Sequence, residues 1–451
     1  MVEPGLSNGQ SAIVSAHLLE LMDLLAKYSC RWKTLSFGPG VSVSHQQLFD
    51  QLTADDAPLL ERLYAEDSNL FADIHLFYPP GLWNNNPPQT GTPSPTTVAN
   101  FVSKISSLRY LHLQQGSILT LGFPLGWSRL AELSLNFLPL DNNSPASSPH
   151  VLLQTIAQAC PALIVLTLRA YLPVGEVGNA VTAVTAPIEW TSLQELNISL
   201  DGLFCDYATP DGEPNTDAPF LFLPYIKHIY DCIVTPQLLR LYIQLGHRHG
   251  RDPTSDDILP FHRLIKSSPR LMNLQIGGYH ILKPEALAQC LQSSSLLDTL
   301  ILLPERSPSR RRRALGPRPD SEAISPISDW VPRLLSSLNN LSGSCGCPNL
   351  KLFDIGRCGE YDNLKSILDF LQSESRISRL KLLKADMGEL WGGRALAMTS
   401  NASLIETLRT VQGISLDLKW KEIEPPSENY GRRNPRIGLP DNIYDLAMPY
   451  P

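Results

Sequence analysis

The pattern Leu-x-x-Leu-x-Leu recurs along this chain and constrains its fold more than any other feature. Each copy predicts a short strand that turns its leucines to one face, because successive side chains of a strand alternate between faces. Segments with the spacing of an amphipathic helix lie between the copies. The clear copies begin at Leu108, Leu130, Leu163, Leu193, Leu238, Leu271, Leu297, Leu350 and Ile377. The predicted helices cover residues 14–28, 97–105, 151–160, 257–267, 284–292, 331–341 and 364–371.

A helix, a turn and a strand in repeated order are the plan of a leucine-rich repeat. Neither half of one unit can bury its apolar face alone, so the units stack around a continuous core. We therefore expect an α/β fold, a leucine-rich-repeat solenoid over residues 14–421. It would curve as a horseshoe, with parallel strands on the concave face and helices on the convex face. Less regular copies at residues 32–37 and 60–65 extend the stack, and a weak copy at residues 226–231 predicts one further strand.

The spacing of the copies is irregular. Successive middle leucines are 22 residues apart at Leu111 and Leu133 but 33 apart at Leu133 and Leu166, whereas leucine-rich repeats usually span about 20–29 residues. The longer steps predict inserted loops. Segments rich in proline, glycine and charge cannot supply a core, so we expect disorder or irregular structure there. These segments are the N-terminus 1–13, the loops 79–97 and 304–329, and the proline-rich tail 422–451.

Composition limits the classes of protein to consider. About one residue in six is leucine, and the net charge of -7 argues against nucleic-acid binding, which needs a basic surface. The eight cysteines are scattered, no secretory signal opens the chain, and no apolar run reaches the ~18 residues of a membrane span. We expect a cytoplasmic or nuclear protein without membrane or nucleic-acid partners. The run from Arg310 to Arg313 is a weak candidate for a nuclear import signal, and a charged solvated loop is the favoured interpretation.

Three cysteines near the end of the repeats raise the question of a metal site. Cys345, Cys347 and Cys358 lack the paired spacing of a zinc knuckle and an evident fourth ligand. Cys347 and Cys160 instead stand at the same point of their repeats, between helix and strand. We expect both to be small, buried plugs in the core.

Acid–base chemistry has one further candidate, the segment His247-Arg-His249 close to Asp252. It follows a predicted strand in a turn-rich stretch, so a solvated loop is the favoured interpretation. The chain contains no Gly-x-x-x-x-Gly-Lys, Gly-x-Ser-x-Gly or His-Glu-x-x-His motif. We expect a protein that is not an enzyme, with no catalytic residue, no cofactor and no bound metal.

The strand positions between the leucines carry the expected binding surface. In a curved repeat sheet the leucines enter the core, and their neighbours face the concave side. These neighbours are polar, and Tyr and Arg among them are residues that interface hot spots favour; polarity alone is also what any exposed strand position shows. The expected partner-binding residues are Tyr110, His112, Gln114, Glu195, Asn197, Arg240, Tyr242, Gln244, Asn273, Gln275, Asp354, Arg379 and Lys381.

Several segments resemble the leucine-rich-repeat portion of the fungal F-box protein family. The likeness rests on Leu18-Leu-Glu-Leu-Met-Asp-Leu-Leu followed by Arg31-Trp-Lys-Thr-Leu-Ser-Phe, and on repeat openings such as Pro161-Ala-Leu and Pro348-Asn-Leu. It covers residues 14–420. In that family an N-terminal F-box binds the Skp1 adaptor of a cullin-type ubiquitin ligase, and the repeats recruit the substrate. No Leu-Pro-x-Glu-Ile-Leu-like opening is found here, so the resemblance implies Skp1 and cullin as partners only if an F-box lies upstream.

The sequence therefore predicts a protein–protein interaction module that resembles the substrate-recognition repeats of F-box subunits. Its protein partner would lie on the concave face. The alternative is a ubiquitin-independent leucine-rich-repeat scaffold or regulator, for example of the GTPase-regulating type. Proteins of that type usually keep a strict repeat period, which this chain does not.

Overall fold

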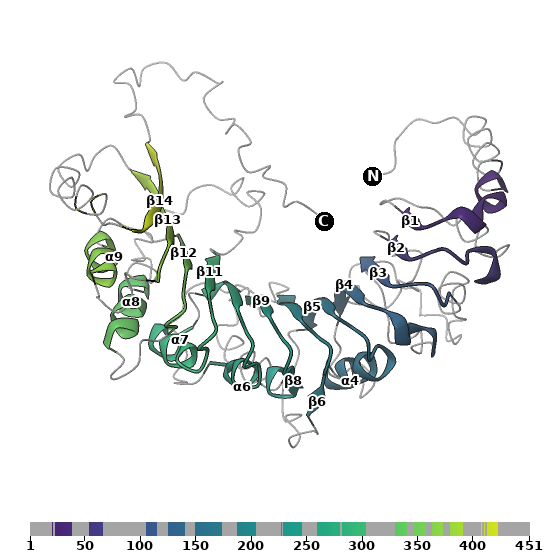
Figure 1. The fold of residues 1–451 in the computed structure, drawn as a ribbon, viewed down its shortest axis with the longest axis horizontal. Coiled ribbons are helices and arrows are strands. Elements are labelled where there is room, and N and C mark those ends of the chain that lie inside the picture. The colour runs from purple at the N-terminus through teal and green to yellow at the C-terminus, as the bar shows by residue number, and fades with distance from the viewer. Residues whose placement is uncertain are drawn as a thin grey trace, which may run out of the picture.

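The computed structural model of the protein is an α/β structure dominated by one sheet of twelve strands (Figure 1). The strands line the inner side of an arc, and the helices lie along its outer side. The structure describes residues 20, 23–37, 54–65, 105–114, 125–139, 149–173, 187–203, 227, 229–245, 259–279, 282–303, 330–340, 347–357, 363–372, 379–390, 407, 410 and 413–422.

The strands of the large sheet are all parallel and follow one another in chain order. Two short strands, β6 (Ile188–Glu189) and β8 (Ile233–Val234), pair in a small sheet of their own. Neighbouring parallel strands need a crossover between them, so each step along the sheet carries a connecting segment. The large sheet consists of β1 (Thr34–Phe37), β2 (Arg62–Ala65), β3 (Tyr110–Gln114), β4 (Glu132–Pro139), β5 (Val165–Pro173), β7 (Glu195–Leu203), β9 (Arg240–Leu245), β10 (Asn273–Gly277), β11 (Thr299–Leu303), β12 (Leu352–Arg357), β13 (Leu382–Leu390) and β14 (Ser415–Glu422).

One residue of every strand stands in a single row across the sheet, which we call the ladder. From Leu63 to Leu383 the ladder residues are at most 1% exposed. Each such buried side chain contributes about 1.5–3 kcal/mol relative to an exposed one. The middle leucines predicted from the repeat occupy this row from Leu111 to Leu300. The ladder residues are Leu35, Leu63, Leu111, Leu133, Leu166, Leu196, Leu241, Leu274, Leu300, Phe353, Leu383 and Leu416.

A second regularity stands at the start of the strands. One backbone carbonyl accepts hydrogen bonds from the two residues that open the next strand; Glu61, for example, accepts from the amides of Arg109 and Tyr110 at 2.9 and 3.0 Å. Because the same bond pair recurs, successive strands begin at the same height. The accepting residues are Lys33, Glu61, Arg109, Ala131, Ile164, Gln194, Leu239, Met272, Asp298 and Lys351.

A buried residue closes the turn before each opening leucine. The carbonyls of Cys160 and Cys347 each accept the amide of the leucine three residues on, at 3.1 Å, and both side chains are buried. The prediction that these two cysteines are equivalent plugs is confirmed. Small side chains fill the same point of other units and are also buried: Ala57, Thr235, Ser268 and Ser294.

The helices pack one apolar side against the ladder. Trp330, Leu334 and Leu338 are buried at helical spacing, and Trp330 Nε1 donates to the carbonyl of Leu282 at 2.6 Å. Among the described residues, no helix has the length and apolarity needed to cross a bilayer. The helices are α4 (Pro149–Ala159), α6 (His262–Lys266), α7 (Pro284–Leu291), α8 (Trp330–Asn340) and α9 (Asn363–Leu371), with 3-10 turns η1 (Ser29–Arg31), η2 (Ala54–Asp56) and η6 (Leu125–Arg129).

The predicted strand at residues 226–231 is wrong. Residues 227 and 229–231 are helical, and the strand β8 begins only at Ile233. Ile229 and Tyr230 are adjacent and both buried, which a strand with one buried face does not allow. The spacing of isoleucines three apart fits a helical turn as well as it fits the repeat.

The strand β14 was not predicted from the sequence, because its copy of the repeat lacks the opening leucine. Gly413 stands three residues before the ladder residue Leu416, at the position of that leucine, and has a φ of 82°. Such a φ favours glycine. The predicted irregular segments 1–13, 79–97 and 304–329 lie outside the described residues, as do residues 423–451.

Candidate functional site on the inner face of the sheet

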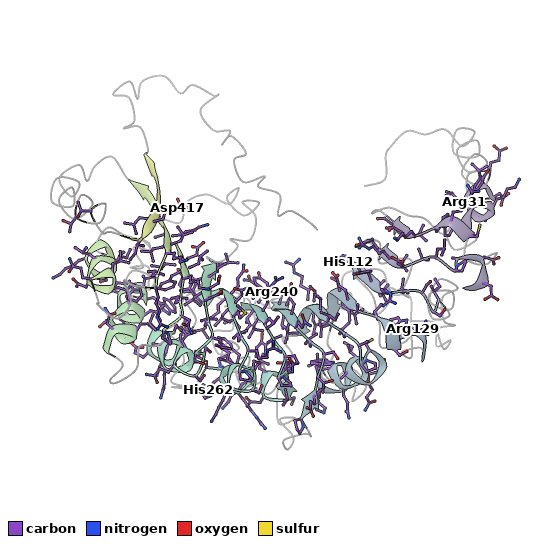
Figure 2. The ribbon with its side chains drawn as sticks, in the orientation of Figure 1. Arg31, His112, Arg129, Arg240, His262 and Asp417 are labelled. Atoms are coloured by element: carbon purple, nitrogen blue, oxygen red, sulfur yellow. The ribbon has the colours of Figure 1, made fainter. Side chains whose placement is uncertain are left out.

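The inner face of the sheet is formed by the strand residues that alternate with the ladder. Most of them are half-buried. Ser134 and Ser199 are buried, and the exposed ones are Thr34, Ser36, Arg62, Arg240 and Ser415. Figure 2 places His112, Arg240 and Asp417 on this side of the arc. One row reads Arg62, Tyr110, Glu132, Val165, Glu195, Arg240, Asn273, Thr299, Leu352 and Leu382, and the next reads Tyr64, His112, Ser134, Thr167, Asn197, Tyr242, Gln275, Ile301, Asp354 and Lys384.

Most of the predicted binding residues therefore stand where the sequence placed them. His112, Asn197 and Tyr242 are half-buried and belong to one sheet. Gln114 and Gln244 lie one step further along their strands, where Gln114 pairs with Asn136. The structure brings Tyr110, His112, Glu195, Asn197, Arg240, Tyr242, Asn273, Gln275 and Asp354 into the two rows.

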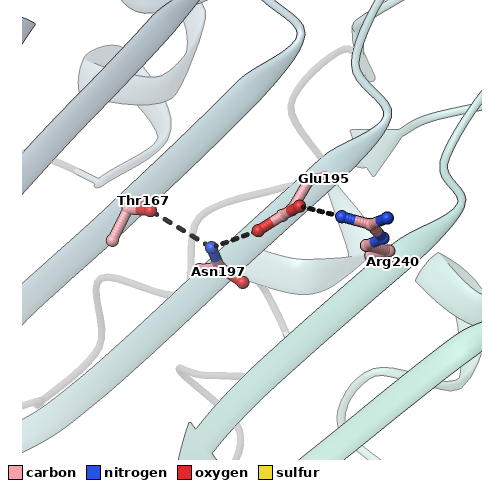
Figure 3. Close-up of polar contacts among 4 residues, drawn as sticks. All are labelled: Thr167, Glu195, Asn197 and Arg240. Atoms are coloured by element: carbon pink, nitrogen blue, oxygen red, sulfur yellow. Dashed lines mark hydrogen bonds and ion pairs between the residues drawn. The ribbon is translucent and has the colours of Figure 1, made fainter. Parts of the chain in front are cut away.

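A chain of polar contacts crosses three strands at the centre of the face (Figure 3). Asn197 Nδ2 donates to Thr167 Oγ1 at 3.2 Å and to Glu195 Oε1 at 3.1 Å. Arg240 Nη1 donates to Glu195 Oε2, also at 3.2 Å, and makes an ion pair with it. Side chains from β5, β7 and β9 are thus held in fixed orientations relative to one another.

The contacts continue across β9 and β10. Tyr242 Oη donates to Gln244 Oε1 at 2.9 Å. A Cβ added to Gly277 would lie 2.0 Å from the same oxygen, so the Gln244 side chain lies directly over this glycine. Gly277 therefore leaves room for Gln244 to support the Tyr242 hydroxyl.

Asn273 extends the polar row toward β11. The neighbouring oxygens are hydrogen-bond acceptors, so the side-chain amide is oriented with its nitrogen toward them. Nδ2 then donates to Thr299 Oγ1 and to Asp298 Oδ1, both at 3.1 Å. The hydrogen-bonded part of the inner face therefore reaches the edge of β11.

Aromatic and cationic side chains meet at the other end of this polar stretch. The guanidinium of Arg62 lies over the ring of Tyr110, 4.5 Å from its centroid, a cation–π contact. The rings of Tyr64 and His112 stand 6.1 Å apart. Tyr, Arg and His on β2 and β3 thus form a second supported group.

Two carboxylates face each other across Val165. Glu132 and Glu195 each pair with Val165 in the register, so two strand spacings, roughly 9–10 Å, separate their backbones. Burial raises the pKa of the Glu132 carboxyl; the charge of Glu195 raises it further, whereas Arg62 lowers it. Two carboxylates, with Arg62 and Arg240 close to them, therefore stand at the centre of the face.

The placement of Arg379 and Lys381 on this face is wrong. The ladder residue of β13 is Leu383, which pairs with Phe353, so the repeat begins at Leu380, three residues later than the sequence suggested. Lys381 occupies the position of Lys351 before the strand, and its amide donates to the Lys351 carbonyl at 2.8 Å. Arg379 is exposed in the preceding turn and donates to Asn349 Oδ1 at 2.7 Å.

Sequence reasoning missed the apolar end of the face. Ile301 and Leu303 of β11, Leu352 of β12 and Leu382 of β13 all occupy inner-face positions and are half-buried. The signal was available in the repeat, because each stands at an odd offset from its ladder residue. The predicted binding residues are all polar, so these four apolar side chains are not among them.

Of the cysteines and histidines considered above for a metal site or acid–base chemistry, Cys347 alone lies within the described residues. Cys347 is buried, and its thiol donates to the carbonyl of Leu291 at 3.5 Å. Cys345, Cys358, His247, His249 and Arg310 to Arg313 lie outside the described residues. Within the described ranges, no three His, Cys, Asp or Glu side chains gather as metal ligands.

No protein-family model matches the chain, and no curated protein is significantly similar to it.

Proposed function

We propose that the chain is a leucine-rich-repeat solenoid that binds a protein partner on its inner face. The in-register ladder, the recurring carbonyl at each strand start and the outer helices support the repeat architecture. Repeat solenoids use their extended concave surfaces for binding.

The observation that carries the proposal is the hydrogen-bonded group of Glu195, Asn197, Arg240 and Tyr242. These side chains remain accessible, yet hydrogen bonds fix their orientations. These side chains therefore lose less conformational entropy when a partner binds than freely rotating side chains would. Tyr and Arg are the residues that most often dominate binding energy at protein interfaces.

The partner would be complementary to the carboxylates at the centre of this face and to its apolar end. A basic group fits between Glu132 and Glu195, and an apolar group fits over Ile301 and Leu352. The likeness to F-box proteins makes a ubiquitin-ligase substrate the first class of partner to test, with Skp1 and cullin involved only through an F-box upstream.

The alternative, a ubiquitin-independent scaffold or a GTPase regulator, remains a competing proposal that the same experiment addresses. Ladder residues are 22 residues apart from Leu111 to Leu133 but 53 apart from Leu300 to Phe353. Such uneven steps do not favour the strict period of GTPase-regulating repeats.

The experiment compares Tyr242→Ala with Gln289→Ala in quantitative affinity capture. Gln289 is exposed on α7, on the outer side of the arc, and serves as the matched control. Proteins that bind the inner face should be depleted several-fold by Tyr242→Ala and retained by Gln289→Ala. Identical partner profiles for the two variants would remove Tyr242 from the interface. Substrates captured together with Skp1 and cullin would favour the ubiquitin-ligase proposal over a scaffold.

A further inference from the structure

A hollow of about 530 Å³ lies on the outer side of the arc, away from the inner face. Figure 2 places His262, one of its lining residues, on that outer side. Lys227 and Asp231 line one wall, and α6 with the residues next to it lines the other. The lining side chains are Lys227, Asp231, Leu259, His262, Arg263, Lys266 and Ser267.

The charge of this hollow is opposite to that of the whole protein. Lys227, Arg263 and Lys266 bring three positive charges against the single carboxylate of Asp231, in a chain with a net charge of -7. Among the described residues, none of these three cations makes a hydrogen bond or ion pair through its side chain. The lining therefore carries more positive than negative charge, because one carboxylate stands against three cations.

The walls of the hollow are anchored in the core. Tyr230, next to Asp231, is fully buried and meets the ring of Phe261 edge-on, with centroids 6.1 Å apart. On α6, Leu264 and Ile265 are buried while Arg263 and Lys266 are exposed. Residues three apart lie on one face of a helix, so the fold directs both cations outward together.

Ser267 also lines the hollow. Ser267 Oγ donates to the Leu264 carbonyl at 2.9 Å, which leaves its oxygen free to accept but not to donate. The donors of the hollow are therefore its ammonium, guanidinium and imidazole groups. A volume of about 530 Å³ falls in the range of small-molecule sites, about 300–1,000 Å³.

We propose that this hollow binds a small polyanion that carries more than one phosphate group. A single phosphate would engage only part of a cluster of three cations, whereas linked phosphates reach both walls at once. Arginine and lysine are the side chains that bind phosphate most strongly. The site is separate from the inner face, so the proposal does not depend on the protein-binding function.

Isothermal titration calorimetry of the full chain with tripolyphosphate at low salt tests the proposal. The wild-type protein should bind it at one saturable site. The double variant Arg263→Ala/Lys266→Ala should lose at least tenfold in affinity. The control Arg379→Ala/Lys381→Ala removes the same charge from another exposed segment and should bind as the wild type does. Failure of the wild type to bind, or an equal loss in both double variants, would overturn the proposal.

Two further arms identify the ligand. Orthophosphate should bind more weakly than tripolyphosphate, and equal affinities would contradict the requirement for linked phosphates. A phosphoserine peptide should also bind more weakly; tighter binding of the peptide would show a protein-docking site instead.

Lys227→Gln, on the opposite wall, should weaken tripolyphosphate binding independently of α6. A loss in the α6 variant without a loss in Lys227→Gln would contradict a ligand that spans both walls.

Discussion

The inner face has two regions that differ in chemistry although they share one sheet. From β3 to β9 it carries Tyr110, Glu132, Glu195, Arg240 and Tyr242. Arg240 makes an ion pair with Glu195, and Tyr242 donates to Gln244. From β11 to β13 it carries the apolar Ile301, Leu303, Leu352 and Leu382, beside the charged Asp354 and Lys384. The ladder beneath both regions is the same apolar row, at most 1% exposed.

The difference teaches that the ladder determines the architecture and leaves the inner face free to vary. Ladder positions are constrained by burial, since a polar side chain there would lose its solvation. Inner-face positions are half-exposed and tolerate glutamate as well as leucine. If the inner face binds a partner as proposed, its specificity resides in residues that the repeat pattern does not dictate.

The largest effect is expected from a charge placed in the ladder. Leu166→Asp lies beneath the polar region and Leu300→Asp beneath the apolar region, and both positions are 0% exposed. Each variant should lose several kcal/mol of unfolding free energy, because an unpaired buried carboxylate is costly. Thermal unfolding followed by circular dichroism measures the loss, with Thr167→Ala as the inner-face control. An unchanged melting temperature for either variant would contradict the common ladder.

Two buried cysteine thiols are expected to make the stability of the interior depend on pH. Burial raises the pKa of Cys160, before β5, and of Cys290, on α7, from 9.0 to about 12. The unfolded chain loses these protons near pH 9 and the folded chain does not, so stability present below pH 9 should fall as pH rises toward 12. The slope is at most about 1.4 kcal/mol per pH unit for each thiol.

The measurement is urea unfolding from pH 8 to 10, where Cys160→Ala and Cys290→Ala should each flatten the decline. Site-resolved thiol labelling provides a second check, in which the exposed Cys30 should react well before either buried thiol. A decline that neither substitution alters would contradict this prediction.

A neighbouring pair on β12 separates ladder from inner face within the apolar region. Phe353→Ala should cost about 3–5 kcal/mol, as expected for a buried aromatic side chain, because Phe353 is 0% exposed. Leu352→Ser should cost about 1 kcal/mol, because its side chain is only half-buried. Chemical denaturation compares the two directly. Equal costs would show that the inner face is part of the core there.

The smallest effect is expected in the polar region. The side chains of Arg240 and Glu195 are 66% and 28% exposed, so solvent screens their ion pair and its coupling should be below about 1 kcal/mol. A double-mutant cycle with Arg240→Ala and Glu195→Ala measures it, and added salt should reduce it. A larger coupling that salt does not change would indicate a pair that supports the fold.

The ladder could be predicted from the sequence because burial repeats the same residue type at a fixed offset. The repeat pattern predicts the ladder positions Leu111, Leu133 and Leu166 in this way. It also predicts Leu35 and Leu63, whose copies are less regular. The copy near β13 failed because Leu380, Leu382 and Leu383 offer two registers, and only the strand pairing selects between them. Arg379 and Lys381 were misplaced for that reason.

The contacts on the proposed binding surface were less predictable than the fold. The sequence identified Asn197 and Arg240 as inner-face residues, but their contacts with Thr167 and Glu195 depend on which strands are neighbours. The outer hollow was missed entirely, because Lys227 and Arg263 are distant in sequence and meet only through the packing of Tyr230 on Phe261. The local spacing of apolar residues does not predict which distant residues line the same hollow.

Site-specific photo-crosslinking tests most directly whether the inner face is the docking surface. A benzoylphenylalanine probe replaces Tyr242 in one variant and Gln289 in the other, and each is irradiated in cell extract. We expect a discrete crosslinked protein from position 242 and none from position 289. The same crosslinked protein obtained from position 289 alone would place the partner on the outer side and contradict inner-face binding.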